Sequence, residues 1–239
     1  MHRYSILFIS FLFLFSSSVF SEKHQADSDY QNVYLSEQHD SLQGNQILYN
    51  GRLWRNLYLR VRDNQFLFSN DFLQGSVSIG GNEFKGLFIK YDIYNDEIII
   101  PGSNGAIMQL NKEMVDSFSF TYQLKNYRFA KITEDSVKGI FGYVNMLYRG
   151  NSALYIKYRK EIDLLAVDDK YDKFFQINKI YLIKDGIVHL INNRRDLLKN
   201  MEDHKAQLKE FIKKNKIIVS KKNPDSFIPL VRYYDTLRN

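Results

Sequence analysis

The sequence has no cysteine, and only three prolines and one tryptophan among 239 residues. The absence of cysteine excludes disulfide bonds, catalysis by a thiol, zinc sites with thiolate ligands and attachment of a lipid to a cysteine. The fold therefore depends on its apolar core alone. Residues 22–239 are numerous enough to form one domain with a good core, or two small domains in close contact.

Long hydrophobic runs are also scarce, and the clearest extends from Ile6 to Phe15 after Arg3. It is about 10 residues long, whereas a helix that spans a bilayer needs roughly 20. Val19 and Ser21 match the small residues before a signal-peptidase cleavage site. We predict a signal peptide over residues 1–21, with an uncleaved amino-terminal anchor as the alternative. No later segment predicts a transmembrane segment, so the expected location is periplasmic or extracellular, in the cell envelope.

Motifs for catalysis and cofactor binding are missing as well. There is no GxSxG or GxGxxG, and Gly81–Gly86 is followed by Leu87 where a phosphate loop requires lysine. The histidines form no HExxH pair and are spread over the chain: His2, His24, His39, His189 and His204. His204 falls on the apolar side of a predicted helix, near a break at Glu202-Asp203, without a neighbouring nucleophile. We therefore expect no cofactor, no metal site and no catalytic residue.

Acidic residues occur in three close pairs: Glu134 with Asp135, Glu161 with Asp163, and Asp168 with Asp169. A glycosidase needs two carboxylates from different strands that face one cleft. Neighbours in the sequence do not provide this arrangement by themselves. We interpret these acids as solvated groups of loops and strand edges.

The residue pattern predicts a sheet in the first part of the chain and helices at its carboxyl end. Residues 22–44 are polar and without periodicity, and predict a loose leader. Across residues 45–192, short aromatic and β-branched runs alternate with turn residues, which is typical of antiparallel hairpins in a meander, a sandwich or a partly open barrel. The turn sequences are Asn50-Gly51, Asp63-Asn64, Gly80-Gly81-Asn82, Asn95-Asp96, Pro101 to Gly105, Gly150-Asn151 and Asp185-Gly186. Asn50-Gly51 and Asp185-Gly186 are the strongest, because their residues tolerate positive φ.

A helical period begins at Asn193 and predicts helices over residues 193–239. The first helix places apolar residues on one face: Leu197, Leu198, Met201, Leu208, Phe211 and Ile212. The second, from Ser226 to Leu237, does so with Phe227, Leu230, Val231 and Tyr234. We predict an α+β fold, in which an extensive antiparallel sheet is followed by two amphipathic carboxyl-terminal helices packed on it.

The segment KYDIYNDEIII, from Lys90 to Ile100, carries three acids close together and ends in three isoleucines. We predict a two-residue hairpin at Asn95-Asp96 that pairs Tyr94 with Glu97, Ile93 with Ile98, Asp92 with Ile99 and Tyr91 with Ile100. Because side chains alternate across a sheet, Tyr91, Ile93, Ile98 and Ile100 then face the core. Lys90, Asp92 and Glu97 face solvent, with Asp96 in the turn. The spacing of a calcium loop is missing.

Two stretches resemble a family of uncharacterised exported proteins from Bacteroidota. The first runs from about Asn50 to Phe120 and includes GSVSIGGNEFKGLFIKYDIYNDEIII, and the second is the block LKEFIKKNK followed by LVRYYDTL. The resemblance covers most of residues 22–239 and implies a location in the envelope. The family has no assigned activity, so the resemblance gives no catalytic residue.

Positive charge is concentrated at the carboxyl end, where residues 181–239 hold 13 Lys and Arg against 7 Asp and Glu. After the first long helix the sequence gives a patch of five lysines: Lys213, Lys214, Lys216, Lys221 and Lys222. These cations either complement the carboxyl end of the helix or form a patch for an anionic glycan or lipid headgroup. An exported protein rarely meets nucleic acid, so we do not expect nucleic acid as a partner.

Aromatic residues are abundant, with 17 Tyr and 18 Phe. Such residues fill the core of a sheet or bind sugars and protein partners, although the single tryptophan, Trp54, weakens the case for sugars. The leading hypothesis is a non-catalytic envelope protein that binds a protein or glycan partner. The alternatives are a carrier of lipid or another hydrophobic ligand on a curved sheet, and a hydrolase with carboxylates from separate strands.

Overall fold

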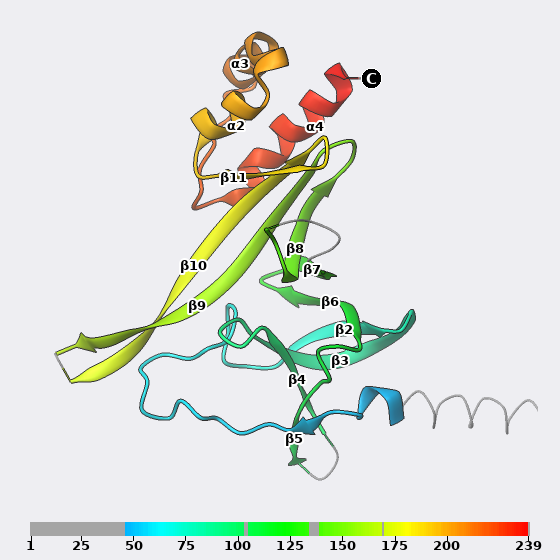
Figure 1. Ribbon diagram of the computed structural model, residues 1–239, viewed down its shortest axis with the longest axis vertical. Helices are drawn as coiled ribbons and strands as arrows, with labels where there is room; N and C mark the ends of the chain where they lie inside the picture. Colours follow the sequence, from blue (N-terminus) through cyan, green and yellow to red (C-terminus); the bar gives the residue numbers. More distant parts are fainter. Residues whose placement is uncertain (1–45, 103–104, 134–138, 169, 239) are drawn as a thin grey trace, which may run out of the picture. The chain divides into compact units, whose positions relative to one another are not determined.

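A computed structural model describes residues 46–102, 105–133, 139–168 and 170–238 (Figure 1). The chain divides into two units, Met1–Ile47 and Leu48–Asn239. The second unit holds all the strands described below and the helices α2 to α4. The predicted signal peptide and most of the polar leader lie outside the described residues. No helix in the described part has the length and apolarity needed to cross a bilayer.

In the part of the chain that the structure describes, eleven strands form one antiparallel sheet that does not close on itself. They are β1 (Arg52–Leu53), β2 (Leu73–Ile79), β3 (Asn82–Asp92), β4 (Glu97–Pro101), β5 (Ile107–Gln109), β6 (Val115–Tyr122), β7 (Lys125–Ile132), β8 (Gly142–Arg149), β9 (Ala153–Val167), β10 (Tyr171–Lys184) and β11 (Ile187–Ile191). Their order in the sheet is β1-β5-β4-β3-β2-β6-β7-β8-β9-β10-β11. The prediction of an α+β fold with a large antiparallel sheet before carboxyl-terminal helices is confirmed.

Two of the predicted glycine turns form two-residue hairpin loops. Gly80 and Gly81 link β2 to β3, Asp185 and Gly186 link β10 to β11, and all four residues have positive φ. Positive φ at both central residues matches the twist of the paired strands. The prediction for Asn50-Gly51 was wrong, because Gly51 leads into β1, where a side chain would meet the Gln109 carbonyl oxygen at 2.2 Å.

One two-residue hairpin could not be recognised from its residue types. Gln123 and Leu124 link β6 to β7, with φ values of 47° and 62°. Neither residue type favours positive φ. The long pairing of β6 with β7 imposes this turn on the chain, and the Leu124 side chain is left fully exposed.

The helical region is interrupted at Glu202-Asp203, where the sequence indicated a break. The first predicted helix is split into α2 (Arg194–Asn200), a 3-10 turn (Glu202–His204) and α3 (Lys205–Lys214). Asn193 caps α2, since its side chain accepts a hydrogen bond from the Asp196 N–H. A second 3-10 turn (Pro224–Phe227) leads into α4 (Ile228–Leu237), within two residues of the second predicted helix. The predicted apolar stripe of that helix is fully buried: Phe227, Leu230, Val231 and Tyr234.

One carboxylate on helix α4, that of Asp235, forms hydrogen bonds to the sheet. Asp235 is 5% exposed and accepts hydrogen bonds from the Ser152 N–H, at 3.0 Å, and from the Tyr148 hydroxyl. Ser152 lies in the loop between β8 and β9, so this contact joins the last helix to the β8–β9 hairpin. Helix α4 also contacts α3, as predicted for an amphipathic pair beside a sheet.

The centre of the sheet is filled by aromatic rings. Phe118 on β6 stacks on Phe129 on β7 with ring centroids 4.6 Å apart, and Tyr91 on β3 meets both rings edge-on. Phe120 and Tyr143 complete the group and are also buried. Many of the abundant aromatic side chains therefore stabilise the core, where edge-on and offset pairs are favourable.

The register of the segment from Lys90 to Ile100 differs from the prediction by two residues. Asp92 pairs with Glu97, and Tyr91 pairs with Ile98, so the loop has four residues, from Ile93 to Asp96. A shift of two keeps each side chain on its face, and the four predicted core residues are buried. The expected solvent face was wrong for Asp92, which is fully buried.

The wider loop is stabilised by the buried carboxylate itself. Asp92 accepts hydrogen bonds from the Tyr94 and Asn95 backbone N–H groups and from the Asn95 side chain, each at 2.9 Å. Such bonds from an aspartate to backbone groups two and three residues ahead form an Asx-type turn. A two-residue loop has no room for this turn, which explains the error in register.

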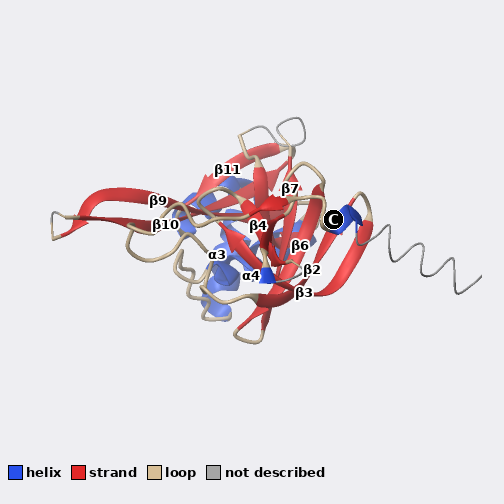
Figure 2. Cartoon of the chain, turned by 90° about the horizontal axis from the view of Figure 1, so that it is seen from below, coloured by secondary structure: helices blue, strands red, loops and turns tan. Residues whose placement is uncertain are grey.

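Strands β9 and β10 continue beyond their neighbours as a two-stranded arm, seen projecting to one side in Figures 1 and 2. The last pair that joins β8 to β9 is Asn145 with Ile156, and β11 leaves β10 at Ile180. The arm is held near its base, where the Lys160 N–H donates to the Ile93 carbonyl oxygen at 3.1 Å. The β3–β4 loop is thereby placed against the middle of β9.

A stabilising substitution follows from the end of α3. Lys216 has a φ of 50°, and the next N–H, of Ile217, donates back to the Ile212 carbonyl oxygen at 3.0 Å. This position usually holds glycine. We expect Lys216→Gly to raise the free energy of unfolding by about 0.5–1 kcal/mol, because it removes the strain of positive φ.

The measurement for this substitution is urea denaturation. Lys214→Gly, inside the last turn of α3, is the matched control and should lower the free energy of unfolding by about 1 kcal/mol. Equal losses in both variants would contradict the assignment of Lys216 to the glycine position of the cap.

Candidate anion-binding site

A pocket of about 360 Å³ lies between the β3–β4 loop, the segment before β8 and the base of the β9–β10 arm. These elements meet because the β3–β4 loop hydrogen-bonds to β9. The pocket combines four cations, one carboxylate and three aromatic side chains. It is lined by Ile93, Tyr94, Asn95, Asp96, Lys112, Gly139, Ile140, Phe141, Lys157, Arg159, Lys179 and Tyr181.

Asp96 is the centre of the polar network in this pocket. One carboxylate oxygen accepts from the Lys157 ammonium at 2.8 Å and from the Tyr91 hydroxyl. The other lies 3.3 Å from the Lys112 ammonium and accepts from the Tyr143 N–H at 3.3 Å. Asp96 has a φ of 61°, a conformation that aspartate adopts more readily than most residues. Asp96 was expected in a turn and lies in the β3–β4 loop, but its side chain is only 16% exposed and contacts two lysines.

Burial and the ion pair oppose each other in this network. Burial alone would raise the pKa of the Asp96 carboxyl, but the Lys157 ammonium, its hydrogen bond and the Tyr91 hydroxyl hold that pKa below its usual value. Burial lowers the pKa of Lys157, and Asp96 offsets part of that effect. Burial, followed by the nearby Asp96 charge, raises the pKa of Tyr91 well above its usual value. At neutral pH Asp96 is therefore ionised and Tyr91 is neutral.

The pocket also requires a residue without a side chain. Gly142, at the start of β8, has a φ of 76°, and a Cβ atom built on it would lie 2.0 Å from the Asp96 carboxylate and 2.9 Å from the Lys157 nitrogen. Only glycine adopts this φ at low cost and also leaves room for the ion pair. The backbone of β8 can then bring the Tyr143 N–H to Asp96.

Positive charge exceeds negative charge in the pocket. Lys157 lies directly opposite Lys179 in the β9–β10 ladder, an arrangement that destabilises a sheet unless an anion lies nearby. Asp96 neutralises Lys157, and Arg159 pairs with Glu161 at 3.2 Å. The Lys179 ammonium has neither a hydrogen bond nor an ion pair to any residue that the structure describes. The pocket can therefore hold a carboxylate, a sulfate or a phosphate group.

Aromatic side chains form one wall of the pocket. Tyr94 is held edge-on against Tyr58 and Phe174, with ring centroids 5.0 and 5.4 Å away. Tyr181 lines the pocket from β10, and Phe141 is 72% exposed beside it. Exposed rings of this kind provide large contact area at low entropic cost.

The lysine patch predicted from the sequence lies elsewhere, at the helical end of the chain. All five side chains are exposed: Lys213, Lys214, Lys216, Lys221 and Lys222. Lys213 lines a groove together with Arg194 and Lys209. The Lys221 ammonium donates to the Asn192 side chain at 3.1 Å, which brings this lysine near the start of α2.

The residues of the pocket were not recognised from the sequence. Lys112, Lys157 and Lys179 come from three segments that only the folded sheet brings together. The one local signal was the alternation of Lys157 and Arg159 on a strand that carries Ala153 and Tyr155 before them on the same face.

The other candidates show no catalytic arrangement among the described residues. Asp163 lies opposite Lys173, and Glu161 lies opposite Phe175, so neither pairs with an acid across the ladder. Asp168 lies at the end of the arm, and Glu134, Asp135 and Asp169 are outside the described residues. His189 lies on β11, and His204 contacts the Tyr234 ring edge-on. No group of three or more acids and histidines in the described ranges could hold a metal ion.

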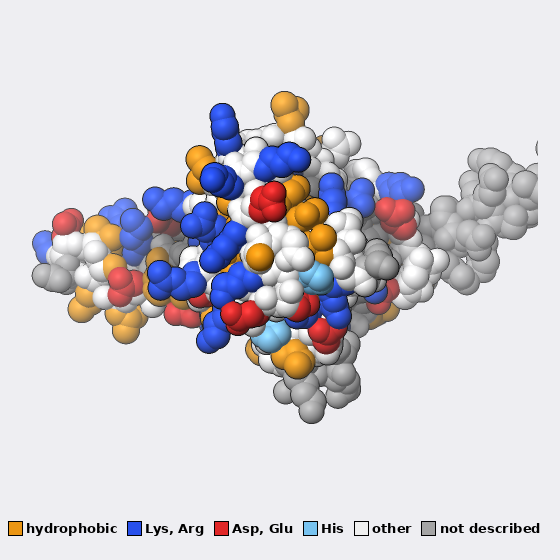
Figure 3. Space-filling view, turned by 90° about the horizontal axis from the view of Figure 1, so that it is seen from above, with side chains coloured by type: hydrophobic (Ala, Val, Ile, Leu, Met, Phe, Trp, Pro, Cys, Tyr) orange, Lys and Arg blue, Asp and Glu red, His pale blue; other side chains and the backbone are white. Residues whose placement is uncertain are grey.

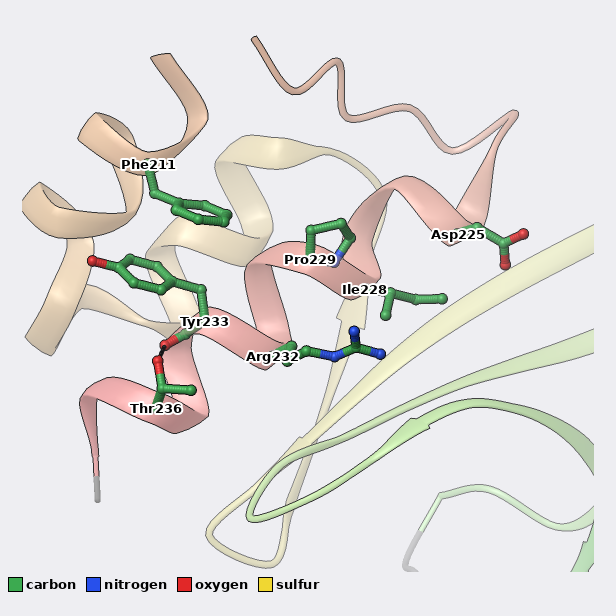
Figure 4. A pocket seen from close by; sticks show the side chains of 7 residues that line it. All are labelled: Phe211, Asp225, Ile228, Pro229, Arg232, Tyr233 and Thr236. Atoms are coloured by element: carbon green, nitrogen blue, oxygen red, sulfur yellow. Dashed lines mark hydrogen bonds between the residues drawn. The ribbon is translucent and has the colours of Figure 1, made fainter. Parts of the chain in front are cut away.

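A second, larger pocket of about 550 Å³ lies between α3 and α4 (Figure 4). Its wall is mainly apolar, and Phe211 stacks on Tyr233 with ring centroids 4.2 Å apart. Its one carboxylate, Asp225, already pairs with Lys125. This groove offers contact area but few groups that would orient a ligand.

Comparison with known proteins adds no identification, since no family model, no curated protein and no solved structure matches the chain.

Proposed function

We propose that this protein is a non-catalytic protein of the cell envelope that binds an acidic glycan through the pocket around Asp96. The observation that carries the proposal is the unpaired Lys179 beside Lys157, in a pocket where four cations surround one carboxylate. A carboxylate or sulfate on the ligand would restore the charge balance. Hydrogen bonds between ionised partners are about twice as strong as neutral ones.

The remaining lining suits a sugar ring. Tyr94, Phe141 and Tyr181 offer ring faces, and the Asn95 side chain can exchange hydrogen bonds with hydroxyl groups. Binding rather than catalysis is favoured because Asp96 is the one acid among the lining residues and is committed to Lys157 and Lys112. An acid or base that works on a substrate must be within hydrogen-bond reach of it and free to exchange a proton.

The test is calorimetric titration with oligosaccharides that contain uronic acid or sulfate, and with neutral oligosaccharides of the same length. We expect Lys179→Gln to weaken binding of the acidic ligand about ten- to hundredfold, because a charge-assisted hydrogen bond contributes about 1.5–3 kcal/mol. Lys85→Gln, on the β2–β3 hairpin and 76% exposed, is the matched control and should bind normally.

Equal affinity for acidic and neutral sugars, or an unchanged affinity in Lys179→Gln, would contradict the proposal. Circular dichroism of each variant distinguishes loss of binding from loss of folding. Sulfate or citrate that competes with the glycan would further place the anion in this pocket.

The apolar groove between α3 and α4 favours one alternative, a carrier of a hydrophobic ligand. This alternative predicts that a lipid co-purifies with the protein and that Tyr233→Ala releases it. Native mass spectrometry without any bound lipid, together with no uptake of a fluorescent fatty acid, would eliminate this alternative.

A further inference from the structure

The loop between α3 and the turn before α4 carries a surface that the pocket does not use. Residues 213–223 read KKNKIIVSKKN, and in the middle of this segment Ile218 is 85% exposed. We define the basic loop surface as Lys213, Lys216, Ile218 and Lys221, with Arg194 and Lys209 beside them. Arg194, Lys209 and Lys213 line one groove, and Lys221 reaches Asn192, two residues before Arg194.

Among the described residues, no carboxylate forms an ion pair with the cations of this surface. Apart from Glu210, the acids of residues 181–238 already have partners in other contacts. Arg238 pairs with Asp185, Lys184 with Asp203, Lys205 with Glu202 and Lys125 with Asp225, while Asp196 and Asp235 accept from backbone N–H groups. For the lysines of the surface, the one contact within the described residues is to the neutral side chain of Asn192. Figure 3 shows Lys and Arg side chains gathered on this end of the molecule.

Ile218 distinguishes between the partners that such charge could attract. An acidic polysaccharide is solvated and gains nothing from an exposed aliphatic side chain. A bilayer offers both components, because anionic headgroups attract the lysines and the boundary of the acyl chains accepts an apolar side chain. Lysine stems also lie along an apolar surface while their ammonium groups stay in water.

We infer that the basic loop surface docks the protein on an anionic lipid bilayer, with Ile218 entering the headgroup region. This surface and the Asp96 pocket lie on different elements, and the inference does not depend on the proposed glycan. Docking of this kind is peripheral and reversible, and it weakens as salt rises.

The test is co-sedimentation of the full chain with vesicles of phosphatidylcholine alone, and with vesicles that also contain about 30% phosphatidylglycerol. The apolar segment at residues 6–15 would bind both kinds of vesicle, so the readout is the difference between them. Each lysine near an anionic surface contributes about fivefold to partitioning. Neutralising three lysines should therefore lower the ratio of binding to anionic over neutral vesicles roughly a hundredfold.

Separate variants test the contribution of the lysine charges, the contribution of Ile218, and the effect of substitution elsewhere on the protein. Lys213→Gln with Lys216→Gln and Lys221→Gln should abolish the preference for anionic vesicles, and Ile218→Ser should weaken it while the salt dependence remains. Lys85→Gln with Lys170→Gln and Lys173→Gln removes the same charge elsewhere, and Leu124→Ser removes another exposed aliphatic residue. Both controls should bind normally.

Three results would overturn the inference. Equal binding to neutral and anionic vesicles would show that charge is not recognised, and a normal preference in the triple lysine variant would place recognition elsewhere. Binding of soluble dextran sulfate without binding of anionic vesicles would assign the surface to a solvated polyanion instead.

Discussion

Replacing Asp96 with asparagine should lower the free energy of unfolding by about 3–5 kcal/mol, because the Lys157 ammonium is then left buried without a countercharge. Lys157 is 9% exposed, and its other hydrogen-bond acceptor among the described residues is the Tyr143 carbonyl oxygen at 3.0 Å. Asparagine keeps the shape of the side chain and tolerates the φ of 61° at this position. The change therefore isolates the charge, and urea denaturation measures its effect.

The double variant Asp96→Asn with Lys157→Met should recover most of that stability. Replacing a buried ion pair by uncharged residues of similar volume is often neutral, whereas removing one partner is costly. A double variant that is no more stable than Asp96→Asn would contradict the assignment of the loss to an uncompensated Lys157.

The same ion pair gives an expected dependence on pH. The pKa of Asp96 is lower in the folded state, so its contribution is present above the pKa of the unfolded chain, near 4, and is lost as pH falls through the folded value. Burial raises the pKa of Asp92, so Asp92 has the opposite sign and favours folding as pH falls. Stability of Asp96→Asn should therefore decline less between pH 5 and 2 than that of the unmodified chain, which thermal unfolding across this range would measure.

Gly142→Ala should be the second severe change, with a loss of about 2–5 kcal/mol. The φ of 76° is strained for alanine, and the new methyl group would occupy the space of the Asp96 carboxylate. Positive φ costs about 1–2 kcal/mol, and overpacking costs about 1–3 kcal/mol more. Because the methyl group displaces Asp96, binding of the acidic glycan should be lost together with stability.

Gly139→Ala provides the matched control for the backbone. Gly139 has a φ of 87°, but a Cβ atom there would meet nothing within 4 Å. Gly139→Ala should lower the free energy of unfolding only by the cost of positive φ, about 1–2 kcal/mol. Equal losses in the two variants would mean that contact with the ion pair adds nothing, and would contradict the assigned role of Gly142.

Local patterns predicted the elements of this protein well. Alternating aromatic and β-branched residues predicted the sheet, and the spacing of Phe227, Leu230, Val231 and Tyr234 predicted the buried face of α4. These signals are carried by neighbours in the sequence, where strand and helix periods differ. The break between α2 and α3 was anticipated at Glu202-Asp203 and is a 3-10 turn there.

The register of the strands and the length of the loops were predicted less well from the sequence. The turn after Asp92 was expected to have two residues and has four, because the buried Asp92 carboxylate needs the Tyr94 and Asn95 N–H groups as donors. A hydrogen bond between a side chain and the backbone is not visible in a pattern of apolar residues. The same limit made Gln123-Leu124 unrecognisable as a turn, since strand pairing determines it.

The sequence by itself determined that this chain is an α+β protein without disulfides, with an antiparallel sheet, two regions of amphipathic helix at the carboxyl end and excess positive charge there. Those properties follow from composition and from periods of two and 3.6 residues, which are local. The tertiary structure alone decided that Asp96 is a partly buried ion-pair partner of Lys157 and that Lys112 and Lys179 share its pocket. Charges distant in the sequence interact only after folding brings them close and removes the water between them, and no pattern of neighbours encodes that distance.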